Sequence, residues 1–549
     1  MRLFSRYILL FILLLGITSA GFIARSSDSY FLIKKNFTIF SEVFESVSNI
    51  YVDEVDPERL MRRGISSMLE ELDPYTVLID ESESRRMDMV TTGQYAGVGL
   101  EVGARGGQLV VIAPIEGYSA ERRGVRAGDI IKKADGIDVS RMGAEDLQSL
   151  LRGDPGSTVV LTIQRQGIED LLDFELTRET IDVNNVFYTG LLESDDRIGY
   201  ILLNRFAQNA AEEVREAILE LEEDAPLDGL VLDLRNNPGG LLEESVKIID
   251  KFVPAGETVV WTEGRLSRAN QTYETSEEPV YPDKPLVILQ NNGSASASEI
   301  VSGALQDLDR AVVVGERSFG KGLVQIVQDL SYNASLKITT SKYYMPSGRS
   351  IQSTPYVTEQ EMADMEEVPD SLRTPFTTKA GRTVYEGIGI EPDLTTTERQ
   401  QTMLEIALLQ NSHYFFFAND YVAEHDTIPE DLDLDVLYSD FREYLRNRDF
   451  QYVTRPERHL QRFRESLEDE LVEEFSERIS DMEELIELKK EREKEQFAEH
   501  IREELYLELV SRYQGRSGRI RESLKTDPAA IQAVDLLQNR VNYAFILEP

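Results

Sequence analysis

The sequence predicts a multidomain α/β (α+β) protein, and three observations predict this class. The chain has 549 residues, which is enough for about three or four domains at roughly 150 residues each. Residues 179–399 alternate strand-like and helix-like stretches, as in an α/β layered core. Residues 93–178 form a β-rich module, whereas residues 25–92 and 400–549 favour helix.

Residues 1–24 have the composition of a signal peptide or membrane anchor. Arg2 and Arg6 precede an apolar run that ends in small residues, which is the pattern of a secretory signal. The run is just long enough to span ~30 Å of hydrocarbon, so a cleaved signal and a retained anchor both stay open. No Cys follows the run, which excludes lipoprotein anchoring. We expect the remaining chain to be exported and to lie in the periplasm or cell envelope.

Residues 25–92 are predicted to be helical, because apolar residues repeat at intervals of three and four over residues 40–50 and, less regularly, over residues 60–69. The module of residues 93–178 has short strand-like runs between Gly-rich turns. Its strand-like runs are residues 98–102, 109–113, 130–134 and 159–164, and one helix-like stretch covers residues 144–151.

Residues 179–399 are predicted to form the α/β core. Strand-like runs at residues 230–234 and 286–289 each lead into a loop of turn-forming or small residues and then into a helix. This order, repeated along the chain, is typical of layered α/β proteins. The other predicted elements are a strand at residues 198–203 and helices at residues 210–221 and 299–306.

Residues 400–549 are highly charged and contain almost no Gly. They could cap the core, drive homo-oligomerisation or dock an adaptor, and we favour a structural and assembly role. In the whole chain Lys and Arg total 58 and Asp and Glu total 99, so the formal net charge is −41. A chain this acidic repels nucleic-acid phosphates, so we expect no nucleic-acid partner.

Two absences restrict the chemistry. The chain has no Cys, which excludes disulfides, thiolate nucleophiles and Cys-ligated metals. Its only His residues lie in the last quarter of the chain, at His413, His425, His459 and His500. A site built from upstream residues therefore works without imidazole, which rules out a Ser-His-Asp triad there.

Three segments of the core could carry chemistry. The first, residues 292–299, reads Asn-Gly-Ser-Ala-Ser-Ala-Ser-Glu and joins a strand to a helix. A Ser at this helix N-terminus is placed to act as a nucleophile, since the free N–H groups there favour a developing oxyanion. Plain helix caps are the alternative for all three Ser residues.

The second segment, residues 315–322, nearly matches the phosphate-binding pattern GxxxxGK followed by Ser or Thr. Gly322 replaces the hydroxyl residue that binds magnesium, and residues 323–330 resemble a strand where that loop requires a helix. We therefore expect no nucleotide site. Lys321 lies between two glycines. A desolvated Lys loses its proton more easily and can act as a general base, with an ordinary surface Lys as the alternative.

The third segment, residues 232–240, reads Leu-Asp-Leu-Arg-Asn-Asn-Pro-Gly-Gly. A Pro-Gly-Gly turn after a buried strand can point N–H groups at an anion, and a simple tight turn is the alternative. No single segment is specific. Together they supply a nucleophile, a base and an oxyanion donor in a part of the chain that has no His.

These motifs resemble those of the carboxyl-terminal processing peptidases, also called tail-specific proteases, over about residues 35–395. The resemblance implies Ser296 as the nucleophile, Lys321 twenty-five residues later as the base, and Gln325 four residues after the base. It also implies a ClpP/crotonase-like α/β protease core with an inserted PDZ domain. Two further segments match the family, residues 343–352 and 387–393.

The same resemblance implies a serine endopeptidase that needs no metal and no cofactor. Neutral Lys321 would take the proton of Ser296 as its Oγ attacks the scissile carbonyl, with Gln325 orienting Lys321. An acyl-enzyme would form, and water would hydrolyse it. The N–H groups implied for the oxyanion hole are those of Gly239 or Gly240, as alternatives, and of Ala297.

Residues 93–178 then resemble a PDZ domain, and residues 124–131 match its central segment. Such a domain would recognise protein substrates by accessible, nonpolar C-terminal tails, with the peptide added as a strand. Arg152 matches a family Arg linked to substrate sensing, with a surface Arg as the alternative. The loop expected to bind the tail carboxylate comprises Gly97, Val98, Gly99 and Leu100.

The alternative function is a catalytically silent PDZ scaffold that binds protein C-termini at the envelope without cleaving them. The intact Ser296, Lys321 and Gln325 argue against it. An adaptor or lipoprotein partner, and a homo-oligomer, are compatible with both functions.

Overall fold

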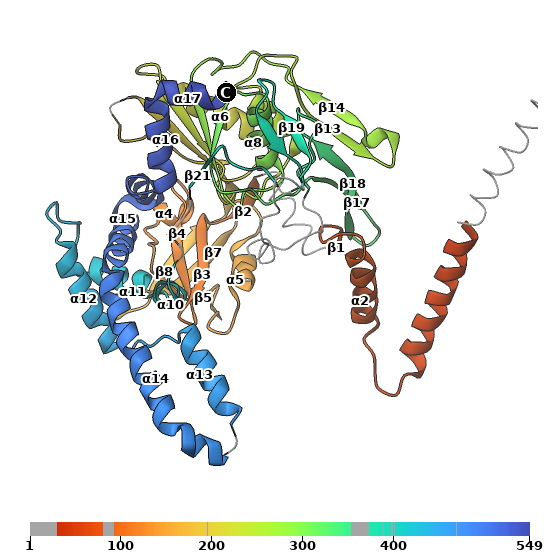
Figure 1. Cartoon of the computed structure of the whole chain (residues 1–549). Helices are drawn as coiled ribbons and strands as arrows, with labels where there is room; N and C mark the ends of the chain where they lie inside the picture. Colours follow the sequence, from red (N-terminus) through yellow and green to blue (C-terminus); the bar gives the residue numbers. More distant parts are fainter. Residues whose placement is uncertain are drawn as a thin grey trace, which may run out of the picture. The chain divides into compact units, whose positions relative to one another are not determined.

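The computed structural model describes residues 30–80, 93–194, 196–352, 373–387, 389–396, 399, 401–467 and 469–548. The chain forms two compact units, residues 1–82 with 325–339 and residues 83–324 with 340–549. Figure 1 shows their helices and strands. The predicted signal or anchor lies outside the described residues. Within the described ranges, no helix is both long and apolar enough to cross a bilayer.

The first unit contains the predicted N-terminal helices. Residues 30–50 are helical, and α2 (Pro57–Glu70) begins after Asp56, whose carboxylate caps the helix. Strand β1 (Val77–Ile79) then pairs antiparallel with residues 335–337. The sequence does not predict β1, because three residues are too few to show a period of two.

The β-rich module forms an antiparallel sheet of the order β3-β4-β5-β7-β8, with β6 paired to β5. Helix α5 (Ala144–Leu151), which has the predicted bounds, packs against β3 and β5. Strand β3 is an edge strand, because its partner within this sheet is β4 alone. A ribbon of β2 (Gln94–Gly97) and β9 (Glu179–Asp182) brings the two ends of the module together. The other elements are β3 (Leu100–Arg105), β4 (Gln108–Pro114), α4 (Ser119–Arg122), β5 (Ile130–Ala134), β6 (Ile137–Asp138), β7 (Thr158–Gln164) and β8 (Leu172–Thr177).

The predicted α/β core is confirmed as a six-stranded sheet of the order β10-β11-β12-β15-β16-β21. Strands β11 to β21 are parallel, and β10 is antiparallel to β11. Because parallel neighbours end at the same edge of a sheet, the loops after β12 and β15 lie side by side. The strands are β10 (Val186–Leu191), β11 (Ile198–Leu203), β12 (Gly229–Asp233), β15 (Leu286–Gln290), β16 (Val312–Gly315) and β21 (Leu394–Thr395).

Helices cover both faces of this sheet. Successive residues of a strand face opposite sides, so Leu232 of β12 packs against the first helical layer and Val231 against the second. The last two helices of the chain therefore cap the core, which is one of the roles left open for residues 400–549. The first layer is α6 (Ala210–Leu221), α7 (Leu242–Ile249) and α8 (Ala297–Asp307), and the second is α16 (Pro528–Gln538) and α17 (Arg540–Leu547).

The other C-terminal helices form a domain with an aromatic core that includes Phe417 and Phe441. This domain contacts the β-rich module, since the Gln166 amide donates a hydrogen bond to Asp420 at 2.8 Å. The helices, drawn in blue shades in Figure 1, are α10 (Met403–Gln410), α11 (His413–Glu424), α12 (Leu434–Asn447), α13 (Arg455–Glu465), α14 (Asp469–Gln496) and α15 (Ala498–Ser523).

Short strands complete the fold. Strand β13 pairs antiparallel with β14 and with residues 341–344 of β18, and β19 pairs with β20. Residues Leu323–Asp329 form strand β17, as predicted, and this excludes the phosphate-binding loop, which requires a helix there. The bounds of the others are β13 (Thr258–Gly264), β14 (Gln271–Glu274), β18 (Ser335–Tyr344), β19 (Pro375–Thr377) and β20 (Thr383–Tyr385).

The hydroxyl of Tyr543 fixes α17 to the sheet. It accepts a hydrogen bond from the Leu286 N–H and donates one to the Leu286 carbonyl, both at 3.0 Å, and the side chain is buried. We expect Tyr543→Phe to lower the free energy of unfolding by about 1–3 kcal/mol, because buried backbone groups lose a partner. Urea unfolding followed by circular dichroism measures this. Tyr332→Phe, at a side chain that is 98% exposed, is the control, and equal losses in the two variants would contradict the prediction.

Candidate active site

The nucleophile segment is a sharp turn between β15 and α8. Ser296 directly precedes α8 with φ 55° and ψ −111°, a backbone conformation that residues with a Cβ rarely adopt. Strain of this kind persists only where surrounding contacts enforce it, and it is enriched at functional sites. Ser296 is half-buried, and it lies at a helix N-terminus where N–H groups have no partner within the helix.

The neighbouring serines are committed to structural hydrogen bonds. Ser294 Oγ donates to the Leu234 carbonyl at 2.8 Å. Ser298 Oγ donates to the Asn237 carbonyl, also at 2.8 Å. Both side chains are fully buried. Ser296 is therefore the accessible serine of the three, a distinction that the residue types alone do not provide.

The turn that follows β12 packs directly on Ser296. Gly239 has φ +96°, and a Cβ at this position would lie 2.9 Å from the Ser296 Cβ, so only glycine fits. Its N–H donates to Asn237 Oδ1 at 2.9 Å and is therefore engaged. Within the described part of the chain, no acceptor is bonded to the N–H groups of Gly240 and Ala297. Of the three predicted donors, these two are the ones available to an oxyanion.

Glu299 joins the nucleophile turn to the segment that carries Lys321. Its carboxylate is completely buried, and its donors come from both segments. Burial raises the pKa of Glu299, while the hydrogen bonds favour the charged form and act against that shift. The donors are the Ser296 N–H (2.8 Å), Ser318 Oγ (2.6 Å), the Gly320 N–H (2.6 Å) and the Lys321 N–H (2.9 Å).

Tyr343 connects the same two segments through different atoms. Its hydroxyl contacts the carbonyl oxygen of Ser296 at 3.3 Å and that of Lys321, and the side chain is buried. Glu299 thus accepts hydrogen bonds from the N–H groups of Ser296 and Lys321, and the Tyr343 hydroxyl, with one hydrogen to donate, lies within hydrogen-bond distance of both of their carbonyl oxygens. The backbones of the two residues are fixed relative to each other.

Neither Glu299 nor Tyr343 is among the predicted catalytic residues. A signal for Glu299 exists, since Ser followed three residues later by Glu is the capping-box pattern of a helix start. Tyr343 begins the family-matching segment 343–352, but that match gives no role for it, because its role depends on β18 lying beside the Lys321 segment, where the Tyr343 N–H donates to the Gly322 carbonyl at 3.1 Å.

The two further segments that match the family both support the Lys321 segment. Gln352 Oε1 accepts a hydrogen bond from the Gly322 N–H at 2.9 Å. The Ile390 N–H donates to Ser318 Oγ at 2.7 Å. These contacts order the loop on either side of Lys321. Ile388, in the second segment, lies outside the described residues.

Gln325 lies on β17 and belongs to the first compact unit, where its amide donates to Thr339 Oγ1 at 3.3 Å.

The side chains that could bind a metal ion are those of His, Asp and Glu, since the chain has no Cys. In the ranges that the structure describes, His, Asp and Glu form no cluster suited to a metal ion.

The predicted tail-binding loop joins β2 to β3. The Val98 side chain is buried, and the Val98 and Gly99 carbonyls accept backbone hydrogen bonds that fix the loop. The Arg152 guanidinium lies over the Tyr95 ring, 5.7 Å from its centroid. Burial raises the pKa of the Tyr95 hydroxyl. Arg152 is therefore placed beside the strand that leads into the loop.

Comparison with known proteins gives matches to the β-rich module, to the α/β core and to the C-terminal helices. Peptidase family S41 matches residues 197–360, a PDZ domain matches residues 110–165, and the C-terminal helical domain of a probable PDZ-protease matches residues 404–537. A carboxy-terminal-processing protease from Bartonella bacilliformis is 39% identical over 321 residues, which cover 58% of this chain and 73% of that protein. A probable CtpA-like serine protease from Staphylococcus aureus is 35% identical over 318 residues, or 58% of this chain and 62% of that protein. Among solved structures, the photosystem II D1 C-terminal processing protease is 29% identical, with coverage of 65% and 92% and a TM-score of 0.35.

The contacts of Glu299 predict a strong effect of Glu299→Gln. An amide has one acceptor oxygen, so its NH2 group would face an N–H donor. We expect the Ser296 hydroxyl to react about 100-fold more slowly with a fluorophosphonate, because small displacements of reacting groups have effects of this size. The labelling rate measures this. Glu316→Gln neutralises a carboxylate of the same loop that does not contact Ser296 or Lys321, and it should label at the wild-type rate. Equal rates in wild type and Glu299→Gln would refute the positioning role.

Proposed function

The chain belongs to the carboxy-terminal-processing proteases of peptidase family S41, which are serine peptidases, and from this premise we propose that it is an endopeptidase of the cell envelope. It recognises protein C-terminal tails through its PDZ domain and hydrolyses peptide bonds with a Ser-Lys pair. The observation that carries the proposal is the double connection made by Glu299 and Tyr343, which hold Ser296 and Lys321 together. The export pattern of residues 1–24 supports the location.

In the proposed reaction, uncharged Lys321 accepts the proton of the Ser296 hydroxyl as Oγ bonds to the scissile carbonyl carbon. The carbonyl oxygen becomes an oxyanion, which the Gly240 and Ala297 N–H groups stabilise. The C–N bond then breaks, and the Lys321 ammonium protonates the leaving amine. Lys321 then deprotonates a water molecule, whose oxygen bonds to the acyl carbon. The bond from that carbon to Ser296 Oγ breaks, the Lys321 ammonium returns the proton to Oγ, and the carboxylic acid product leaves.

Two further roles complete the proposed site. Gln325 orients Lys321, an assignment that rests on the family resemblance, in which a Gln follows the Lys by four residues. Gly239 can add a third oxyanion donor only when its N–H leaves Asn237 Oδ1.

The substrate tail is proposed to bind as an added strand on β3. This strand lies at the edge of its sheet with α5 beside it, and an exposed edge is what an extended peptide requires to continue a sheet. The loop from Gly97 to Leu100 receives the tail carboxylate at its N–H groups. Arg152 responds to occupancy of this site from its position over Tyr95.

Removal of either proposed catalytic side chain should abolish turnover without unfolding the protein. We expect Ser296→Ala and Lys321→Ala to cleave an unstructured protein at least about 1,000-fold more slowly than wild type, since each removes one half of an activated nucleophile. Gel-based cleavage rates and circular dichroism measure activity and folding. Lys342→Ala, at an exposed Lys of β18, is the control. A folded Lys321→Ala variant that cleaves at the wild-type rate would refute the assignment of Lys321 as the base. No cleavage by the wild-type protein would favour the catalytically silent scaffold.

Recognition of the tail should depend on its free carboxylate. We expect a peptide with a nonpolar C-terminus to compete with the protein substrate, and the same peptide with a C-terminal amide to bind at least about tenfold more weakly, because it lacks the charge that backbone N–H groups hold. Fluorescence anisotropy on the Ser296→Ala variant measures binding without cleavage. Equal affinity of the acid and amide forms would contradict carboxylate recognition by the PDZ domain.

A further inference from the structure

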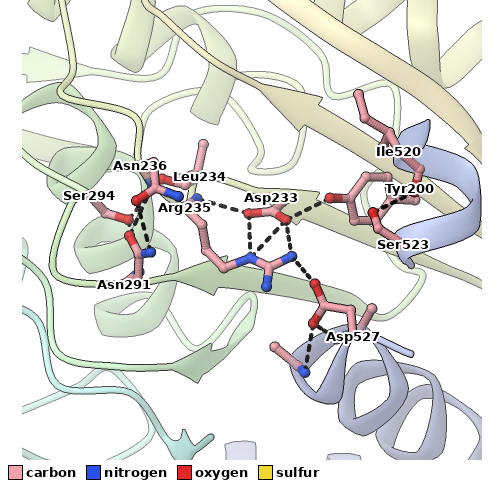
Figure 2. A network of polar contacts seen from close by, with 12 residues as sticks. Tyr200, Asp233, Leu234, Arg235, Asn236, Asn291, Ser294, Ile520, Ser523 and Asp527 are labelled. Atoms are coloured by element: carbon pink, nitrogen blue, oxygen red, sulfur yellow. Dashed lines mark hydrogen bonds and ion pairs between the residues drawn. The ribbon is translucent and has the colours of Figure 1, made fainter. Parts of the chain in front are cut away.

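The turn that carries the oxyanion donors is held by a carboxylate from the other end of the chain. Figure 2 shows the Arg235 guanidinium between the carboxylates of Asp233 and Asp527. Arg235 Nη2 lies 2.6 Å from Asp233 Oδ2 and 2.7 Å from Asp527 Oδ2. Asp233 ends β12, whereas Asp527 directly precedes α16.

These charges are largely removed from water. The side chains of Asp233, Arg235 and Asp527 are 2%, 14% and 19% exposed. Burial opposes the charge of Arg235, but the two carboxylates outweigh it and raise the pKa of Arg235, so the guanidinium stays charged. The Tyr200 hydroxyl donates to Asp233 Oδ2 at 2.6 Å and thus occupies that carboxylate further. Loss of one carboxylate would leave a buried cation undercompensated, which is strongly unfavourable unless the side chain moves.

Asp527 divides its two oxygens between two tasks. Oδ1 accepts hydrogen bonds from the N–H groups of Ala529 (2.9 Å) and Ala530 (3.1 Å) and so caps α16. Oδ2 pairs with Arg235. Asn is as good an N-cap as Asp. The Asp527→Asn variant therefore retains the cap of α16 but loses the ion pair with Arg235.

Arg235 begins a continuous set of hydrogen bonds that ends at the nucleophile turn. The next residue, Asn236, has φ +57°, and its N–H donates to Asn291 Oδ1 at 2.9 Å. The Asn291 N–H in turn donates to Ser294 Oγ at 3.0 Å. Figure 2 shows this pair of loops beside the charged group. Ser294 precedes Ser296 by two residues, so these contacts connect the turn after Arg235 to the turn that carries Ser296.

We propose that Asp527 is a positioning residue for the active site. Through Arg235 it holds residues 235–240 in the geometry that presents the Gly240 N–H to the oxyanion. The C-terminal region thereby contributes to catalysis in addition to covering the sheet. The catalytic consequence rests on the proposed peptidase function, whereas the positioning of residues 235–240 does not.

The test compares full-length Asp527→Asn with wild type and with Lys525→Gln. Lys525 pairs with Glu193 at 3.1 Å on the protein surface, so the control breaks another ion pair between the same part of the chain and the core. We expect Asp527→Asn to increase hydrogen exchange of residues 235–240 about tenfold, and to lower kcat on an unstructured protein about tenfold with KM within about twofold, because the ground-state substrate contacts are untouched.

A double-mutant cycle identifies the route of the effect. In an Arg235→Gln background, Asp527→Asn should change kcat by less than about twofold, since residues that act as one unit are not additive. A tenfold fall in kcat on adding Asp527→Asn to Arg235→Gln would overturn the route through Arg235.

The single variant decides the positioning itself. Unchanged hydrogen exchange of residues 235–240 in Asp527→Asn would overturn the positioning role. Faster exchange with an unchanged kcat would overturn the importance of this positioning for catalysis. Asp527→Ser, which also retains a capping oxygen, replaces Asp527→Asn if the latter does not fold. An inactive wild type would contradict the proposed function, and the exchange comparison would still decide the positioning.

Discussion

The hydrogen bonds of the buried Glu299 carboxylate are the interaction on which the geometry of the proposed active site depends. A carboxylate removed from water is very unfavourable unless hydrogen-bond donors replace its hydration, and here the donors come from two separate loops. The loops must therefore meet at Glu299 for the fold to tolerate it. The same demand explains the strained backbone of Ser296, because its N–H has to point at the carboxylate. The fully buried Glu299 thus fixes the backbone positions of Ser296 and Lys321 in the proposed site.

The sequence predicts local elements well and long-range contacts poorly. The bounds of α5 and α6 agree with the periodicity because both helices bury one face of regular spacing. The pairing of β1 with residues 335–337 and the packing of α16 on the sheet join distant segments, and no local pattern encodes such partners. The site shows the same division. The segments that carry Ser296 and Lys321 are visible as motifs, whereas the burial of Ser294 and Ser298, the engaged N–H of Gly239 and the contact of Tyr343 exist only in the folded chain.

The C-terminal region shows why family boundaries and physical boundaries differ. The C-terminal helical domain is matched as a module of its own, over residues 404–537, yet α16 and α17 supply one of the two helical layers of the peptidase sheet. Val231, Val287 and Leu289 would otherwise face water. The remaining helices extend from this layer to the PDZ domain, where Gln166 and Asp420 meet. One stretch of chain therefore contacts both the catalytic core and the recognition domain.

The open edge of β3 has a consequence for the enzyme's behaviour at high concentration. An unpaired strand edge can pair with other extended segments, so the tail site proposed at β3 is also a place where copies of the chain could associate. Charged side chains at such an edge discourage indiscriminate pairing. Strand β3 carries Glu101, which forms an ion pair with Arg516 of α15, and Arg105 at its end. We therefore expect a variant that lacks the charges of Glu101 and Arg105 to self-associate more readily and to select among peptides less strictly.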